Sequence, residues 1–447
     1  MRNVMPRFAI CGLLLSCAAS AALAQTGMDE RVDKEVGSLT TIYKGLHEHP
    51  ELSMQEKATS SLLAGELRRL GFEVTEHVGK YESPNNIGYG VVGVLRNGPG
   101  PTVMVRTDMD ALPVEEKTGL PYASHVKVKQ QDAEVSVMHA CGHDLHMTAW
   151  IGTARMLVQL KSQWSGTVVM VGQPAEEGFG GAKALLNDGL YTRFPRPDFV
   201  LALHDMPTVP AGKVAWKAGP MLSSADSVDI LVRGYGGHGA APHMTKDPIV
   251  IASEIVVMLQ TIVSREVDPL ESAVVTVGTF HAGTKRNVIP DEALLQLTVR
   301  TMKPEVREKI LAAIKRIAEN VAAAAGIPAD HLPVMRVIQS TPPTINDGEL
   351  SRRVGAALQS ALGKENVLDA DPVMASEDFS EFGLLDPKIP YCMFWLGATE
   401  PKRLEESRVK GTRLPSLHSS EFYPEPAAAI PTGVKAMTAS VMSLLKK

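Results

Sequence analysis

The chain has 447 residues, of which 44% are apolar and 21% are charged, and its net charge is −5. This length is about three times that of a typical single domain, so we expect two domains with substantial hydrophobic cores. The composition is that of a soluble globular protein, and the net negative charge gives no electrostatic reason to expect a nucleic-acid partner.

The first 24 residues have the pattern of an export signal. The positively charged Arg2 and Arg7 precede the apolar stretch FAICGLLLSCAASAALA, which ends in small residues before Gln25. This stretch is short for a bilayer span, so we expect cleavage after Ala24 and export to the periplasm or beyond, with no permanent membrane span. The alternative is a lipoprotein anchored through Cys17, because LLSC loosely resembles a lipidation motif.

Cleavage after Ala24 leaves two cysteines, Cys141 and Cys392. The apolar segment PYCMFWLG predicts a buried strand around Cys392, in which the thiol is a small buried side chain. Cys141 lies between histidines in MHACGHDLHM, so we expect it to be a metal ligand and not half of a disulfide bond.

Apolar strand patterns alternate with helical patterns over much of the chain. PTVMVRTDMD, SGTVVMVGQPAEE and PDFVLALHDMP each end in a polar loop. One helical pattern, SMQEKATSSLLAGELRRLG, has Ser53 and Glu56 at capping-box spacing and Gly71 as its stop. The alternation predicts an α/β fold with a mostly parallel sheet that is covered on both faces.

Residues 219–341 have a different order of elements. Strand patterns in ADSVDILVRG, SAVVTVGTFHAG, EALLQLTVRTM and HLPVMRVIQS combine with two long helical patterns in the order β-α-β-β-α-β. This order is the split-βαβ (ferredoxin-like) arrangement. We therefore expect a small domain at 219–341, inserted between two parts of a larger domain at 27–218 and 342–447.

Metal-ligand side chains follow several of the predicted strands of the larger domain. They are Cys141, His143, Glu176, Glu177, His204 and His418. Ligands in open α/β sheets usually lie in such loops. The set is too large for one tetrahedral zinc ion and suits two metal ions that share a bridging ligand, with one glutamate left to act as a base.

Eight segments resemble the aminoacylase/carboxypeptidase family of two-metal amidohydrolases, in the branch of hippurate hydrolase and the indole-acetyl-amino-acid hydrolases. They are HEHPELSMQE, RTDMDALP, MHACGHDLHM, GQPAEEGFGGAKALL, LHDMP, GHGAAPH, NVIP and SEDFSEF, in consistent order over about residues 35–445. The resemblance implies a catalytic α/β domain with an inserted lid that often mediates dimerisation.

The resemblance also assigns roles in the larger domain. It implies that the metal ligands are Cys141, His143, Glu177, His204 and His418, and that Glu176 is the general base. Cys141 stands where other branches use a bridging aspartate, and Asp108 where peptidase branches have a metal-binding histidine. Asp110 matches a carboxylate that orients a ligand from behind.

In the lid, the resemblance makes His238 a donor to the reaction oxyanion, commonly from the partner subunit, and Asn287 and Arg300 ligands of the substrate carboxylate. His139 and His146 are expected to be supporting residues. His47 and His49 lie in a family segment, but no chemical role can be assigned to them.

These observations lead to an expected function: hydrolysis of N-acyl amino acids with aromatic or fatty acyl groups, by a homodimer or higher oligomer with two divalent ions per subunit. Zinc suits the cysteine and histidines and manganese the carboxylates, with nickel and cobalt as further candidates. Two alternatives remain open, a dipeptidase or carboxypeptidase of the same family and a non-catalytic metal- or ligand-binding protein.

Overall fold

The computed structural model describes residues 9–83, 85–130, 133–178 and 180–445, which form two compact units. The larger unit comprises Met1–Lys217, Asp347–Ala370 and Leu385–Lys447, and the smaller comprises Ala218–Asn346 and Asp371–Leu384. The sequence-based division differs for the segment Asp371–Leu384, which it placed in the larger domain. It belongs to the smaller unit because its backbone pairs there: Val373 N–H donates to Met221 and Ser223 N–H to Ala375.

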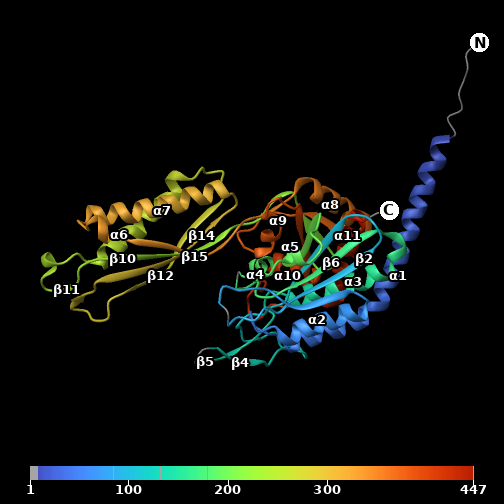
Figure 1. Cartoon of the computed structure of the whole chain (residues 1–447), viewed down its shortest axis with the longest axis horizontal. Coiled ribbons are helices and arrows are strands. Elements are labelled where there is room, and N and C mark those ends of the chain that lie inside the picture. Colours follow the sequence, from blue (N-terminus) through green and yellow to red (C-terminus); the bar gives the residue numbers. More distant parts are fainter. Residues whose placement is uncertain (1–8, 84, 131–132, 179, 446–447) are drawn as a thin grey trace, which may run out of the picture. The chain divides into compact units, whose positions relative to one another are not determined.

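The larger unit is built on an eight-stranded mixed sheet (Figure 1). Its strands lie in the order β1 (Glu73–Val78), β2 (Gly90–Asn97), β6 (Gly166–Gln173), β3 (Thr102–Asp108), β7 (Phe199–Pro210), β18 (Tyr391–Thr399), β8 (Val214–Trp216) and β17 (Val367–Asp369). The four central strands, β6, β3, β7 and β18, run parallel. All nine residues of β18 are buried, as expected of a strand covered on both faces. The predicted α/β fold with a mostly parallel sheet is confirmed.

Four helices of the larger unit pack in a row along the sheet, from β1 at one edge to β17 at the other, and each helix contacts the next. In this order they are α2 (Lys57–Arg69), α3 (His143–Gln159), α11 (Pro426–Leu444) and α8 (Gly348–Leu362). Helix α1 (Ala9–Glu48) packs on α3 and α11. The predicted capping box of α2 is wrong. The helix begins at Lys57 and Glu56 caps nothing, whereas Glu51 accepts the N–H groups of Ala58 and Thr59.

The smaller unit contains a four-stranded antiparallel sheet in the order β12 (Ala273–Ala282), β14 (Glu292–Thr301), β10 (Ala225–Arg233) and β15 (Val334–Thr341). Helices α6 (Pro248–Thr261) and α7 (Pro304–Ala324) cover one face of it (Figure 1). This is the predicted β-α-β-β-α-β order. One apolar stripe of α7 faces the core, since Ile310, Ala313, Ile314 and Ile317 are buried.

Several short elements complete the chain. In the smaller unit β11 (Gly237–His238) pairs with β13 (Val288–Ile289), β9 (Gly219–Leu222) pairs with β16 (Thr344–Asn346), and α9 is Glu381–Leu384. In the larger unit β4 (Lys127–Gln130) pairs with β5 (Ala133–Ser136), and the short helices are α4 (Gly181–Asn187), α5 (Leu190–Arg193) and α10 (Pro401–Lys410).

The predicted export signal falls partly outside the described residues, which exclude Arg2 and Arg7. Helix α1 runs through the predicted cleavage point, and Met28 is the first buried residue among its described side chains. By length and composition, one described helical stretch, Pro248–Glu266, could cross a membrane. It consists of α6 and the turn that follows, and one side of it, including Ile251, Ile255 and Leu259, belongs to the core of the smaller unit.

A buried ion cluster at the end of α1 gives His47 a role that the sequence did not suggest. Its Nδ1 lies 2.6 Å from Asp144 Oδ2 and its Nε2 3.1 Å from Glu116 Oε1, and all three side chains are buried. Burial lowers the pKa of His47, but hydrogen bonds and charges from Asp144 and Glu116 outweigh it and raise the pKa to about 10. Glu116 also accepts the N–H of Ser124, so the cluster ties this loop to α1 and α3.

Replacing His47 by Gln should destabilise the larger unit by about 3–5 kcal/mol, because two buried carboxylates lose their cation. The pKa of His47 in the folded protein lies above its usual value of about 6.5. Its stabilisation is therefore complete below about pH 6.5 and is lost as the pH rises through about 10. The stability difference between wild type and His47→Gln should shrink over this range.

Urea unfolding followed by tryptophan fluorescence measures this difference, because Trp150, Trp164, Trp216 and Trp395 all lie in the larger unit. The exposed His49, which directly follows the same helix, is the matched control, and His49→Gln should behave as wild type. A His47→Gln difference that stays constant from pH 6.5 to pH 10 would contradict a protonated His47.

Candidate metal centre and active site

The side chains proposed as metal ligands converge at the carboxyl edge of the parallel strands. Asp108 ends β3, Glu176 and Glu177 follow β6, and His204 lies in β7. Strands β6, β3 and β7 are parallel neighbours, so the segments that follow them meet at one edge. His143 begins α3 at the same edge, directly after the Cys141 loop.

Cys141 lies at the centre of a group of possible donor atoms for a metal ion. Its Sγ is 3.3 Å from His418 Nε2 and 3.7 Å from His204 Nε2. His418 Nε2 is in turn 3.4 Å from Glu177 Oε1, and the donor atoms of Cys141, Glu177 and His418 lie within 4.8 Å of one another. His418 has a positive φ of 65°, and its N–H donates to Ala140, which fixes the imidazole beside the thiol.

His143 and His204 both direct Nε2 toward the other donor atoms of the site. The Nδ1–H of His143 donates to the carbonyl of Asp110 at 2.7 Å, and that of His204 to the carbonyl of Asp205 at 2.8 Å. Such bonds fix the tautomer whose Nε2 lone pair can bind a metal ion. Among the described residues, His143 Nε2 and Glu177 Oε1 are buried without a hydrogen bond of ordinary geometry, although His418 Nε2 lies 3.4 Å from Glu177 Oε1. A bound cation would satisfy both atoms, so the residues present fit a metal centre.

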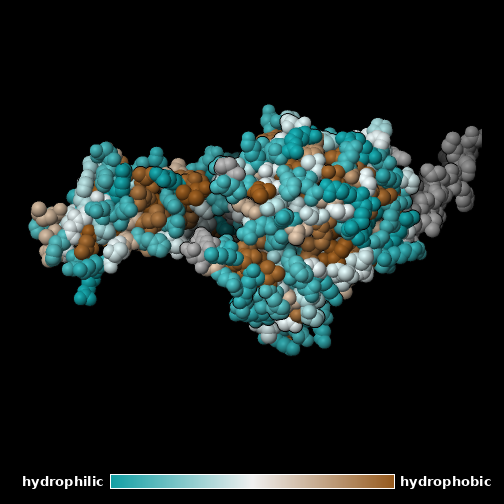
Figure 2. All heavy atoms as spheres, turned by 60° about the horizontal axis from the view of Figure 1, so that its bottom comes forward, coloured by the Kyte–Doolittle hydropathy of each residue, from teal (hydrophilic) through white to brown (hydrophobic). Residues whose placement is uncertain are grey.

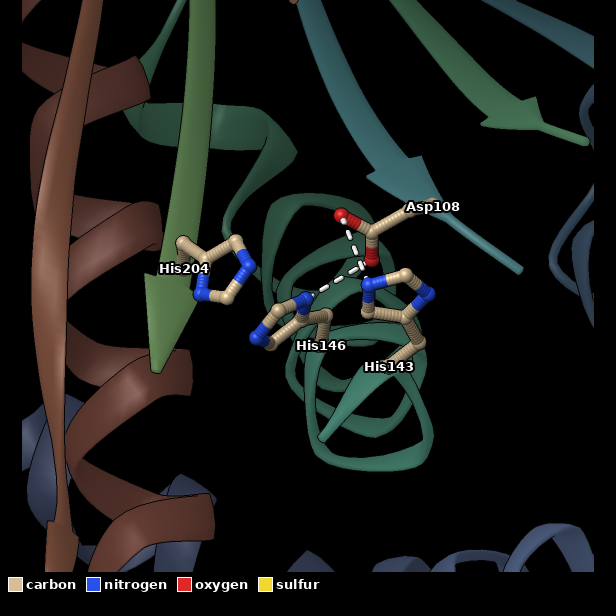
Figure 3. Close-up of side chains that lie close together, drawn as sticks. All are labelled: Asp108, His143, His146 and His204. Atoms are coloured by element: carbon tan, nitrogen blue, oxygen red, sulfur yellow. Dashed lines mark hydrogen bonds and ion pairs between the residues drawn. The ribbon is translucent and has the colours of Figure 1, made fainter. Parts of the chain in front are cut away.

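Asp108 and His146 lie beside these ligands but are fully engaged with other groups (Figure 3). Asp108 accepts from Arg106 at 2.6 Å and from His146 Nδ1 at 2.7 Å, while His146 Nε2 accepts the N–H of Asp205 at 2.8 Å. Figure 3 shows His143 and His146 side by side on α3, with His204 across from them on β7. Of these four residues, only His143 and His204 retain a nitrogen that could bind a metal ion.

Asp110 connects the segments that carry Glu176, Glu177 and His143 through hydrogen bonds. Its carboxylate accepts the N–H groups of Glu176 and Glu177, both at 3.0 Å, and the hydroxyl of Ser53 at 2.5 Å. Its carbonyl accepts from His143. Asp110 therefore holds Glu176, Glu177 and His143 in a fixed arrangement.

The Cys141 loop is shaped by Gly142. This residue has a φ of 73°, and a Cβ there would lie 2.7–2.8 Å from the carboxylate atoms of Asp205, so only glycine fits. Burial and the charges of Glu177 and Glu176 raise the pKa of the Cys141 thiol well above its usual value. A metal ion that binds this sulfur would displace its proton. Cys141 and Cys392 are both free and buried, as the sequence predicted.

One buried side chain near the site, that of Glu56, was not recognised as a contributor from the sequence, whereas that of His139 was expected to support the site. Glu56 accepts the N–H of Ala175 at 2.8 Å, although its spacing from Ser53 suggested a helix cap. His139 is buried, and neither ring nitrogen has a hydrogen-bond partner among the described residues. Burial lowers the pKa of His139 to about 4, so its ring is neutral.

The smaller unit holds the remaining three predicted site residues in two separate places. The N–H of Gly239, next to His238, donates to the carbonyl of Asn287, so these two predicted residues lie together. Arg300 lies near the other end of β14, where it donates to Met374 and Ser376. Eight residues of extended strand separate Glu292 from Arg300, roughly 26 Å. One copy of the unit therefore does not present Asn287 and Arg300 to one carboxylate.

Comparisons with known proteins identify the family of this chain. A model of peptidase family M20/M25/M40 matches residues 104–439. The chain is 39% identical over 384 residues to thermostable carboxypeptidase 1 of Saccharolobus solfataricus, with 85% of this chain and 89% of that protein covered. It is 40% identical over 348 residues to the hippurate hydrolase of Campylobacter jejuni, with 77% of this chain and 85% of the relative covered.

A solved structure, that of a dinuclear metal-binding peptidase of the M20 family from Bacillus subtilis, resembles this chain with a TM-score of 0.71 and 29% identity. The match covers 92% of this chain and 98% of the other. The chain belongs to peptidase family M20/M25/M40, and it is a metal-dependent amidohydrolase.

Proposed function

We propose that this amidohydrolase cleaves N-acyl amino acids, with aromatic or fatty acyl groups, into a carboxylic acid and a free amino acid. The observation that carries the proposal is the position of Glu176, a buried carboxylate beside the ligand set, with Oε2 3.8 Å from His143 Nε2. The 40% identity to hippurate hydrolase supports this substrate class. The 39% identity to a carboxypeptidase supports peptide substrates as the second candidate.

The ligands that would hold two divalent ions, zinc or manganese with nickel and cobalt as further candidates, are Cys141, His143, Glu177, His204 and His418. Bound there, the ions supply Lewis-acid activation of water and of the amide carbonyl. Glu176 accepts the proton of the attacking water and passes it to the departing amine. Asp110 fixes the positions of Glu176 and Glu177, because its carboxylate accepts the backbone N–H of each.

His238 is suited to stabilise the oxyanion. Its Nδ1 accepts the N–H of Ala240 at 3.0 Å, which leaves Nε2–H as the donor. Asn287 lies beside it, and we assign Asn287 and Arg300 to the substrate carboxylate. Because Asn287 precedes β14 and Arg300 lies near the far end of that strand, a single site that used both would draw them from two subunits.

The smaller unit also has a surface suited to a second copy of the chain. Helix α6 and the following turn expose a row of apolar side chains, Ile249, Val250, Val257, Met258 and Val263, of which Val257 is 68% exposed. Figure 2 shows apolar residues gathered on this unit's surface. Strand β12 lies at the sheet edge and, among the described strands, pairs with β14 alone. An apolar face beside an open edge is typical of an interface, and we propose a homodimer through it.

We also propose that the protein is exported and cleaved after Ala24. Cleavage there would leave Met28, from which α1 packs on the larger unit, in the mature chain. Mass spectrometry of the mature protein should give an N-terminus at Gln25. A lipid-modified Cys17 or an uncleaved Met1 would contradict this proposal.

The roles of the two neighbouring glutamates can be separated by mutation. Glu176→Gln should keep its metal content and lose about 10²–10⁴-fold in the rate of hippurate hydrolysis, because only the base is removed. Glu177→Gln should lose metal as well, since its Oε1 lies among the donors of Cys141 and His418. Elemental analysis and turnover of a panel of N-acyl amino acids and dipeptides measure both effects. Equal metal loss in the two variants would refute the assignment, and turnover of dipeptides alone would favour the second candidate.

Action of His238 across a dimer predicts complementation. His238→Ala should lower kcat by about 10²–10³-fold, the usual effect of losing one oxyanion donor. Mixing this variant with Glu176→Gln should restore part of the activity, because a mixed dimer contains one site with both residues intact. Mixing each variant with itself is the control. If confirmed subunit exchange brings no recovery, His238 does not act in trans.

A further inference from the structure

The turn that carries the general base is held by three successive backbone N–H groups. That of Ala175 donates to Glu56 Oε1 at 2.8 Å, and those of Glu176 and Glu177 donate to the two carboxylate oxygens of Asp110 at 3.0 Å each. Two buried acidic side chains from distant parts of the sequence, Glu56 and Asp110, therefore fix every N–H of this segment.

Ala175 needs this support because it has an unusual backbone conformation. Its φ is 50°, in the left-handed region that residues with a Cβ seldom adopt. Its carbonyl is also engaged, by the N–H groups of Gly180 and Gly181. If the bond to Glu56 were lost, the Pro174–Ala175 peptide would be free to rotate, Ala175 would relax toward an ordinary φ, and the carboxylate of Glu176 would turn with it.

We propose that Glu56 is a positioning residue for Glu176, which keeps the Ala175 turn in its left-handed conformation and so directs the base toward His143. This inference rests on the proposed function, because it presupposes that Glu176 is the base. Glu56 would act through the backbone alone, without touching the substrate.

The surroundings of Glu56 fit this role better than a role in helix α2. Glu56 stands at the N-cap position of α2, yet its side chain makes no cap bond, and Glu51 performs that task. The Glu56 side chain is instead buried against the Ala175 turn. Burial, reinforced by the charge of Asp110, raises the pKa of Glu56 to about 8, so at pH 7 the side chain is largely a neutral acid. Glutamine is therefore a close substitute, with a carbonyl oxygen that can accept the same N–H.

Three substitutions at Glu56 and one control test the proposal. Glu56→Ala and the shorter Glu56→Asp should lower kcat for the hydrolysed substrate by up to about 100-fold, the effect of a displacement near 1 Å. KM and metal content should stay unchanged, and Glu56→Gln should retain most of the wild-type kcat. The control is Glu51→Ala, which removes a carboxylate with two N–H bonds from the same segment. It should lower Tm but leave kcat unchanged.

A second measurement does not depend on activity. Hydrogen exchange of the peptide that contains Ala175 should become faster in Glu56→Ala and Glu56→Asp, and stay slow in Glu56→Gln and Glu51→Ala. Wild-type kcat in Glu56→Asp, or equal kcat losses in Glu56→Gln and Glu56→Ala, would overturn the positioning role and leave the proposed function intact. Full activity of Glu176→Gln in the same assay would instead overturn the proposed function.

Discussion

The arrangement of the site depends on the hydrogen bonds of one buried residue, Asp110. Its two carboxylate oxygens hold the backbone of Glu176 and Glu177, and its carbonyl orients His143. Burial raises the pKa of Asp110 to about 6, with the charge of His143 opposing the shift and that of Glu177 adding to it. Several carboxylates thus share a buried region, an unfavourable arrangement that bound cations would relieve.

Much of the fold follows from local patterns. The alternation of strands and helices, the β-α-β-β-α-β order and the inward stripe of α7 all arise from apolar periodicity, which is visible in the sequence. Two features arise from distant contacts instead. Asp371–Leu384 joins the smaller unit through pairing with strand residues about 150 positions earlier, and Glu56 reaches Ala175 across 119 positions. Neither contact leaves a periodic pattern.

The site shows the same division. Residues that follow strands could be identified as candidates because strand ends converge, and the structure brings Cys141, His143, Glu176, Glu177, His204 and His418 together. The sequence could not show that Asp108 and His146 form a hydrogen bond with each other, since that bond depends on the orientation of the two side chains. The separation of Asn287 from Arg300 could have been foreseen, because the predicted strand between them is too long to place both at one end.

The central claim is that Cys141 joins the histidines and Glu177 in holding metal. X-ray absorption at the zinc edge of the zinc-loaded protein tests it most directly. We predict a sulfur scatterer at about 2.3 Å, the usual zinc–thiolate distance, which disappears in Cys141→Ser while nitrogen and oxygen scatterers remain. Only nitrogen and oxygen neighbours at about 2.0–2.2 Å in the wild-type protein would contradict the account.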